Sequence, residues 1–191
     1  MTGYLVKSSY VEGESKLDQI VDGLEDIFKK YPNYDLYITG HSLGGSLAQL
    51  LSFLLAGSKK TEFIPKPIVA VTYASPVVGN KGFVQAYQDL EKEDKVRHIR
   101  VSNDKDMVPG TVFGFKQTGI NFHVKDGPME VGYLKSNSII SQTNLAPLDR
   151  HNLYGEGSYN RRLFRDENSE YLKMTVNELY EKYAGISSKK K

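Results

Sequence analysis

Ser42 lies at the centre of a Gly-x-Ser-x-Gly pattern that spans residues 40–44. A short apolar run at residues 34–37 precedes this pattern, and a helical run at residues 46–56 follows it. A serine in a sharp turn between a strand and a helix holds its hydroxyl clear of the backbone, where it can act as a nucleophile. The backbone N–H of Leu43 follows at the helix N-terminus, where the helix dipole stabilises negative charge. We therefore predict a nucleophile at Ser42 and an oxyanion donor at Leu43.

The glycines of this segment are expected to keep the turn tight. A Cβ at Gly40 or Gly44 would collide with the neighbouring strand or helix, and Gly45 and Ala48 would keep the first helical turn slim. A glycine-rich turn without chemistry is the other interpretation, and the flanking strand and helix favour the nucleophile.

A serine hydroxyl at neutral pH is a weak nucleophile, and it needs a base that is oriented by an acid. In α/β-hydrolases, which share this order of strand, Gly-x-Ser-x-Gly and helix, the serine is followed by the acid and then by the histidine. Asp104 and Asp106 both lie in the turn after an expected strand at residues 96–101, at the edge of the sheet where the acid belongs. One of the two can instead be an ordinary turn aspartate.

The chain contains four histidines, and their positions allow different roles. His41 lies inside the serine pattern, and we expect its side chain to point elsewhere. His98 lies within a strand that precedes both aspartates, which favours a packed or edge histidine. His123 ends an expected strand after Asp106, so chain order alone allows it as the base. His151 opens a segment downstream of all expected strands, where the base belongs, and we therefore favour His151 over His123.

The remaining pattern predicts an α/β fold with a mostly parallel sheet and flanking helices. Apolar residues at helical spacing predict an amphipathic helix over residues 15–30, with Ser15 and Asp18 as its capping box. A β-branched run over residues 68–74 predicts a strand buried on both faces of a parallel sheet. Further expected elements are a strand at 35–39, a helix from Asn80 to about 90, strands at 96–101 and 120–124, and a helix at 169–183, with loop at 126–148. Alternating strands and helices indicate the α/β class.

Composition limits the partners and the compartment. The 191 residues suffice for one domain with a sizeable core, and the net charge of +2 gives no reason to expect a nucleic-acid partner. Three lysines close a tail, residues 186–191, that we expect to be solvated. The chain has no cysteine, no signal peptide in its first residues and no apolar run of about 18 residues, which favours a cytoplasmic location.

The chain resembles the class 3, or fungal-type, lipases, a family of α/β-hydrolases with plant and algal phospholipase A1-like and acylglycerol lipase-like members. Four segments carry the resemblance in order: Tyr31-Pro32 with the serine motif at 38–45, residues 75–80, residues 100–109, and residues 151–154. The second is similar to the Gly-x-Pro-Arg-Val-Gly-Asn segment of the family, although Val77 replaces the arginine. The third is similar to the acid loop of the family, and the fourth to the His-x-x-Tyr around the base.

The resemblance implies a serine esterase that acts on acylglycerols or related lipid esters, needs no metal or cofactor, and can make peripheral contact with a lipid surface. It places the acid at Asp106 and the base at His151. Ser42 would attack the ester carbonyl, and His151 would take the hydroxyl proton and later protonate the leaving alcohol. Asp106 would hold His151 in the right tautomer, and the Leu43 N–H would bind the oxyanion.

The resemblance also implies parts that this sequence lacks, because in the family an upstream loop supplies a second oxyanion donor and a lid helix follows it. Only 41 residues precede Ser42, and residues 2–4 resemble the segment just after the lid. We therefore expect a lipase domain over residues 1–185 that is incomplete at its N-terminus: a fragment, a truncated paralogue, or a chain completed by a partner. The strand before Ser42 would then form an unpaired sheet edge. The alternative function is a non-catalytic lipase-like interaction module.

Overall fold

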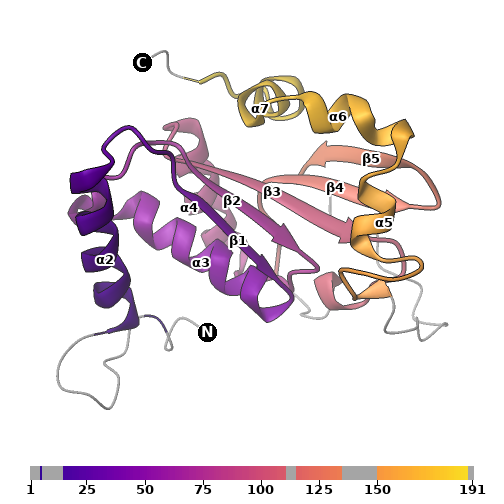
Figure 1. Ribbon diagram of the computed structural model, residues 1–191, viewed down its shortest axis with the longest axis horizontal. Coiled ribbons are helices and arrows are strands. Elements are labelled where there is room, and N and C mark those ends of the chain that lie inside the picture. The colour runs from indigo at the N-terminus through magenta and orange to yellow at the C-terminus, as the bar shows by residue number, and fades with distance from the viewer. Residues whose placement is uncertain (1–4, 6–14, 111–114, 135–149, 189–191) are drawn as a thin grey trace.

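The computed structural model describes residue 5 and residues 15–110, 115–134 and 150–188. Within these residues, a five-stranded sheet has the strand order β1-β2-β3-β4-β5 (Figure 1). The strands are β1 (Tyr37–His41), β2 (Ile68–Tyr73), β3 (Val96–Asn103), β4 (Ile120–Lys125) and β5 (Gly127–Tyr133). The first four strands are parallel, and β5 runs antiparallel to β4. The predicted α/β class with a mostly parallel sheet is confirmed.

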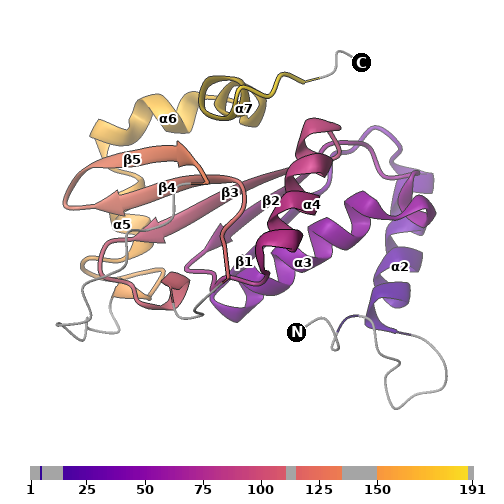
Figure 2. The same ribbon diagram turned by 180° about the vertical axis from the view of Figure 1, so that it is seen from behind.

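Helices cover both faces of this sheet (Figures 1 and 2). One face carries α2 (Lys16–Lys30), α3 (Leu43–Gly57) and α4 (Lys81–Lys92), and the other carries α5 (Tyr159–Leu163), α6 (Ser169–Lys173) and α7 (Val176–Ala184). Each face has its own apolar core. Buried members are Phe28, Leu55, Ile68 and Tyr87 on the first face, and Ile99, Phe122, Leu163 and Tyr180 on the second. The sheet is thus held between two packed layers, which fixes the loops at its edges.

Several expected elements are confirmed with small shifts at their ends. The capping box of α2 is present, because the Ser15 hydroxyl accepts from the Asp18 N–H and the Asp18 carboxylate accepts from the Ser15 N–H. Asn80 caps α4 by accepting from the Phe83 N–H. The strand β2 is paired and buried as predicted, whereas the strand before Ser42 begins two residues later than expected and α3 begins immediately after that serine.

The prediction of loop over residues 126–148 is wrong for β5, and residues 135–148 of that range lie outside the described residues. Asp126 and Gly127 connect the two strands of a β-hairpin, and Gly127, the first residue of β5, has a φ of 108°. An Asp-Gly pair between strands is a strong hairpin signal, and Pro128 at the start of β5 concealed it. Proline is tolerated there because β5 is an edge strand of the described sheet.

The expected continuous helix over residues 169–183 is also wrong, because it is divided into α6 and α7 at Met174 and Thr175. Thr175 has an extended backbone and caps α7 in a capping box with Glu178. The signal is present in the sequence as Thr-x-x-Glu, and the apolar stripe on either side of it obscured the break.

The strand β1 pairs only with β2 among the described residues, so it lies at the edge of the described sheet. The segments at residues 2–4 and 189–191 lie outside the described residues. None of the helices in the described part of the chain is both long and apolar enough to span a bilayer.

Candidate active site

The sharp turn between β1 and α3 places Ser42 at the carboxyl edge of the sheet. Ser42 has a φ of 55° and a ψ of −126°, which is a strained backbone conformation for a residue with a side chain. Its N–H donates to the Tyr73 carbonyl on β2 at 2.9 Å, which ties the turn to the sheet. The Ser42 side chain makes no helix-capping hydrogen bond, so its hydroxyl is left for another partner.

The glycines around Ser42 differ in what they contribute. A Cβ on Gly40 would lie 2.2 Å from the Gly44 carbonyl oxygen, and one on Gly45 would lie 2.8 Å from the Ser75 Cβ. Both positions therefore require glycine, as predicted. The expectation for Gly44 is wrong, because a Cβ there would have no atom within 4 Å. The strand and helix approach each other at Gly40 and Gly45, whereas Gly44 faces open space.

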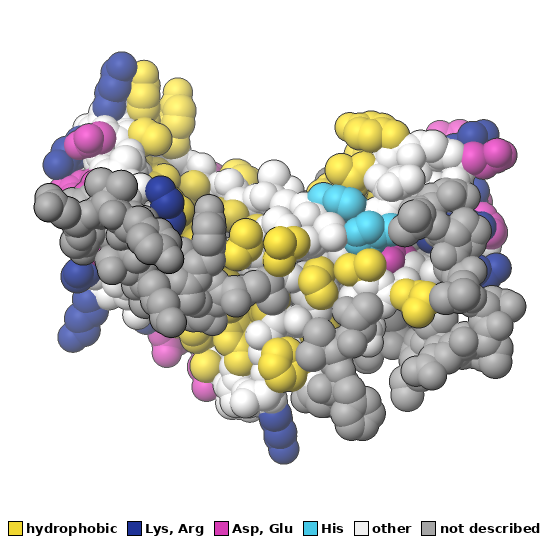
Figure 3. All heavy atoms as spheres, turned by 90° about the horizontal axis from the view of Figure 1, so that it is seen from below, with side chains coloured by type: hydrophobic (Ala, Val, Ile, Leu, Met, Phe, Trp, Pro, Cys, Tyr) yellow, Lys and Arg dark blue, Asp and Glu magenta, His cyan; other side chains and the backbone are white. Residues whose placement is uncertain are grey.

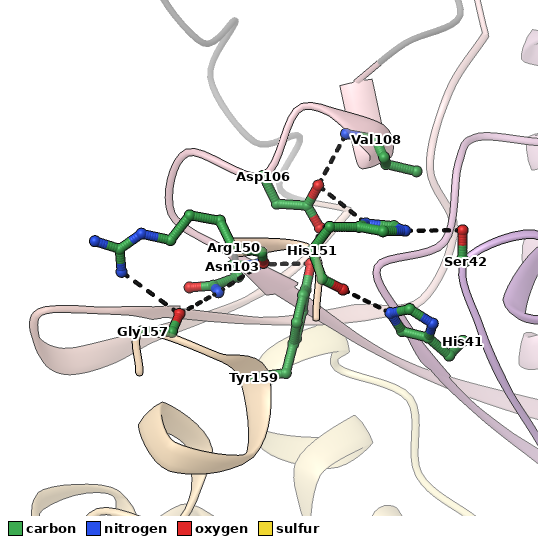
Figure 4. A network of polar contacts seen from close by, with 9 residues as sticks. All are labelled: His41, Ser42, Asn103, Asp106, Val108, Arg150, His151, Gly157 and Tyr159. Carbon is green, nitrogen blue, oxygen red and sulfur yellow. Dashed lines mark hydrogen bonds and ion pairs between the residues drawn. The ribbon is translucent and has the colours of Figure 1, made fainter. Parts of the chain in front are cut away.

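A continuous line of polar contacts joins three of the predicted residues (Figure 4). The Nε2 atom of His151 lies 2.9 Å from the Ser42 Oγ. The Nδ1 atom of His151 lies 3.2 and 3.1 Å from the two carboxylate oxygens of Asp106. The Asp106 side chain is almost fully buried, with 1% exposed, whereas His151 is 20% exposed. The structure thus brings Ser42, His151 and Asp106 together in the geometry of a nucleophile, its base and an orienting acid.

The other candidates lie apart from this line of contacts. His123 on β4 contacts the Ser102 hydroxyl at 3.0 Å, and burial lowers its pKa while the charge of Asp104 opposes that shift. His98 is buried and lies between the hydroxyls of Thr72 and Thr118, and burial lowers its pKa to about 3. His98 is therefore a neutral, packed histidine, as expected.

His41 does not point away from the site, and that expectation is wrong. Its Nε2 donates to the His151 carbonyl oxygen at 2.7 Å, and the two imidazole rings are 4.8 Å apart at their centroids (Figure 4). His41 thus helps to hold the backbone that carries His151. Neighbouring side chains at the end of a strand point in different directions. The contact of His41 with His151 therefore depends on the position of the loop that carries His151.

Asn103, the last residue of β3, anchors the loop that carries His151. Its side-chain amide donates to the carbonyls of Arg150 and Gly157, each at 2.9 Å (Figure 4). Its side-chain Oδ1 accepts from the Arg162 guanidinium at 2.8 Å, and the Asn103 side chain is buried. No sequence pattern predicts this role of Asn103, because both of its loop partners are backbone carbonyls, which any residue carries.

Leu43 is the first residue of α3, and its N–H belongs to the first helical turn, where amides have no acceptor within the helix. This is the position predicted for an oxyanion donor. Exposed hydrophobic side chains lie on the segments that carry Ser42, Asp106 and His151: Leu43 (57% exposed), Met107 (41%) and Tyr154 (75%). Figure 3 shows histidine side chains beside a hollow of this face, with hydrophobic side chains on both sides.

A cavity of about 440 Å³ adjoins the site on the side of the β1 edge. It is lined mainly by aromatic and aliphatic side chains, together with the backbone of β1: Thr39, Gly40, His41, Tyr73, Leu153, Tyr154, Tyr159, Asn160, Leu163 and Phe164. Among the described residues, no group of three His, Cys, Asp or Glu side chains could hold a metal ion.

A mostly parallel sheet with a Gly-x-Ser-x-Gly turn between a strand and a helix defines the chain as an α/β-hydrolase. The sequence profile of the family described as Lipase (class 3) matches residues 2–116, more than half of the chain. The chain belongs to the class 3 lipase family. The match includes Ser42 and Asp106 and ends before His151.

Individual proteins agree with this assignment. The chain is 31% identical to Phospholipase A1-II 5 of Oryza sativa subsp. indica over 167 residues, which is 80% of this chain and 33% of that protein. A triacylglyceride lipase of Rhizomucor miehei matches at 27% identity with a TM-score of 0.58, covering 69% of this chain and 52% of that one. A triacylglycerol lipase whose catalytic centre is a serine protease triad matches at 25% identity with a TM-score of 0.58, covering 77% and 62%. The chain thus spans about a third of the length of its rice relative.

Proposed function

We propose that this chain is a serine hydrolase that cleaves carboxylic esters of lipids. The observation that carries the proposal is the unbroken line of contacts from Ser42 Oγ through His151 to Asp106. Membership of the class 3 lipases and the likeness to a lipase with a serine protease triad support the same reaction.

The reaction begins when Ser42 Oγ attacks the carbonyl carbon of the ester while His151 Nε2 takes the hydroxyl proton. The Leu43 N–H stabilises the negative charge that develops on the carbonyl oxygen, and Asp106 stabilises the imidazolium. When the intermediate collapses, His151 returns the proton to the leaving alcohol, and an acyl group remains on Ser42. Water then attacks this acyl-enzyme with His151 as the base, which releases a carboxylic acid and restores the serine.

The proposed substrates are lipid acyl esters, because the rice relative is a phospholipase A1 and the structural neighbours are triacylglycerol lipases. The exposed hydrophobic side chains around the site suit contact with a lipid surface. Because the chain spans only part of these relatives, both the substrate class and this peripheral contact belong to the proposal.

The test is hydrolysis of p-nitrophenyl butyrate by the purified chain. We expect turnover that falls by about 10⁴-fold or more in Ser42→Ala and His151→Gln. His123→Gln is the matched control, because His123 is the other histidine that chain order allows, and it should leave turnover within about twofold. Turnover that survives Ser42→Ala would contradict the proposal. A folded chain without any turnover would favour the non-catalytic interaction module.

A further inference from the structure

Tyr159 contacts the carboxylate of Asp106 in the interior of the protein. Its side chain is completely buried, and its hydroxyl donates to Asp106 Oδ2 at 2.5 Å (Figure 4). The same hydroxyl accepts from the Asn103 N–H at 3.1 Å. On the other carboxylate oxygen, Asp106 Oδ1 accepts from the Val108 N–H at 3.0 Å. Each oxygen of Asp106 therefore has one further donor besides His151.

These two donors fix the plane of the carboxylate. The carboxyl torsion of an aspartate is a broad one, so a single contact to His151 would leave Asp106 free to turn. Donors on both oxygens hold the carboxylate with both oxygens at nearly equal distances from His151 Nδ1. Burial and the negative charge of Asp106 raise the pKa of Tyr159 well above its ordinary value, so its hydroxyl remains a donor throughout the working pH range.

We propose that Tyr159 is a positioning residue for ester hydrolysis: its hydroxyl holds Asp106 in the orientation that keeps His151 directed at Ser42. This inference rests on the proposed function. Tyr154, in the segment that follows His151, is 75% exposed, whereas the buried Tyr159 is the tyrosine that contacts the acid. Tyr159 touches neither the nucleophile nor the base, so its effect passes through Asp106.

The chain contains a matched control in Tyr180. Its side chain is also completely buried, and its hydroxyl accepts from the His98 N–H of β3 at 2.6 Å and donates to the buried carboxylate of Glu91 at 2.7 Å. Replacing Tyr159 or Tyr180 by phenylalanine removes the same group from the same kind of environment. Only the first replacement releases a carboxylate that contacts a histidine.

Steady-state kinetics on p-nitrophenyl butyrate compare Tyr159→Phe, Tyr180→Phe and the unmodified chain. Both variants should unfold at a lower temperature than the unmodified chain. Tyr159→Phe should lower kcat about ten- to a hundredfold with KM within about twofold, because the lost bond to a charged group acts on the transition state. Tyr180→Phe should leave kcat within about twofold. Equal kcat values for the two variants would overturn the proposal.

A second measurement needs no turnover. At acidic pH the Nδ1–H proton of His151, bonded to Asp106, should give a low-field ¹H NMR signal that His151→Gln removes. Tyr159→Phe should shift, broaden or abolish this signal, and Tyr180→Phe should leave it unchanged. An unchanged signal in Tyr159→Phe would mean that the hydroxyl contributes only to packing. If the chain hydrolyses no ester, the proposed function fails, while this signal still decides the effect of Tyr159 on the Asp106–His151 pair.

If Tyr159→Phe does not fold, 3-fluorotyrosine introduced at position 159 replaces it. The fluorine makes the hydroxyl a stronger donor and preserves the hydrogen bond, so Asp106 binds the His151 proton less tightly. The low-field signal should then move upfield relative to the unmodified chain. A signal that stays at its original position would contradict the proposal.

Discussion

At both ends of β3, a buried tyrosine hydroxyl lies between a backbone N–H of the strand and a carboxylate. At the carboxyl end, Tyr159 binds the Asn103 N–H and Asp106. At the amino end, Tyr180 binds the His98 N–H and Glu91. The carboxylates differ in what else they contact. Asp106 contacts the partly exposed His151, which in turn contacts Ser42. Glu91 instead accepts a second tyrosine hydroxyl, that of Tyr133, and is buried in the core.

The two ends also differ in how burial affects titration. Burial raises the pKa of Glu91 to about 7, against the opposing effects of Tyr133, Tyr180 and Arg97. A perturbed carboxyl in a cleft often marks a functional site. Here Glu91 of α4 accepts hydrogen bonds from tyrosines on β5 and α7, near the amino end of β3. The ester hydrolysis is proposed at the opposite, carboxyl end. The partners of a buried carboxylate, more than its pKa, therefore distinguish a candidate site from core packing.

The largest expected difference between the two ends is in activity. Asp106→Asn should lower kcat on p-nitrophenyl butyrate by about 10⁴-fold, because an amide favours the wrong tautomer of His151. Glu91→Gln should leave kcat within about threefold, since its partners do not reach Ser42. Circular dichroism checks that both variants are folded. Comparable losses in the two variants would remove the functional distinction between the ends of β3.

The turn that presents Ser42 at the carboxyl end can be tested with two glycines of one motif. Gly40→Ala should lower the free energy of unfolding by about 4 kcal/mol or more, because its Cβ would overlap backbone atoms of Gly44. Gly44→Ala should change it by no more than about 1 kcal/mol, with stabilisation of α3 as the expected sign. Urea unfolding measures both. A strongly destabilised Gly44→Ala would mean that the strand and helix approach each other differently.

At the amino end of β3, the titration of Glu91 should make the free energy of unfolding depend on pH. The pKa of Glu91 is about 7 in the folded chain and near 4.5 when unfolded, so the folded state holds this proton more tightly. The stabilisation that this proton gives to the folded state is therefore complete below pH 4.5. It is lost as the pH rises to 7, which lowers the free energy of unfolding by an amount on the order of 3 kcal/mol.

Urea unfolding of the unmodified chain and of Glu91→Gln at several pH values measures this contribution. From pH 4.5 to pH 8, the unfolding free energy of the unmodified chain should fall relative to that of Glu91→Gln. Parallel curves over that range would exclude Glu91 as the source.

The smallest effect is expected at His41, which holds the backbone of His151 and not its imidazole. His41→Phe removes one hydrogen bond to the His151 carbonyl and should lower kcat/KM about three- to tenfold. His123→Phe, on β4, should have no effect on kcat/KM. A loss for His41→Phe as large as that for Asp106→Asn would place His41 in the reaction itself.

Much of this arrangement is predictable from the sequence, for identifiable reasons. The Gly-x-Ser-x-Gly pattern between a strand and a helix predicted Ser42, and chain order favoured His151 as the base. Chain order left Asp104 and Asp106 open as the acid, and the resemblance to the class 3 lipases selected Asp106. Buried parallel strands such as β2 have a composition that few other elements share.

The supporting contacts could not be predicted in the same way. Tyr159 and Asn103 are distant in sequence, and their contacts use the Asn103 N–H and the Gly157 carbonyl. These contacts depend on the path of a loop that no local sequence pattern encodes. The role of Gly45 in place of Gly44 depends on the angle at which α3 leaves the turn. Local signals were present for β5 and for the break before α7, but stronger neighbouring patterns concealed them.

Covalent labelling tests most directly whether Ser42 is an activated nucleophile. The chain is treated with a fluorophosphonate, and the site of modification is mapped by mass spectrometry. We expect a single adduct on Ser42 that is lost in Ser42→Ala and forms far more slowly in His151→Gln. A folded chain that forms no adduct, or forms it at another residue, would contradict the claim.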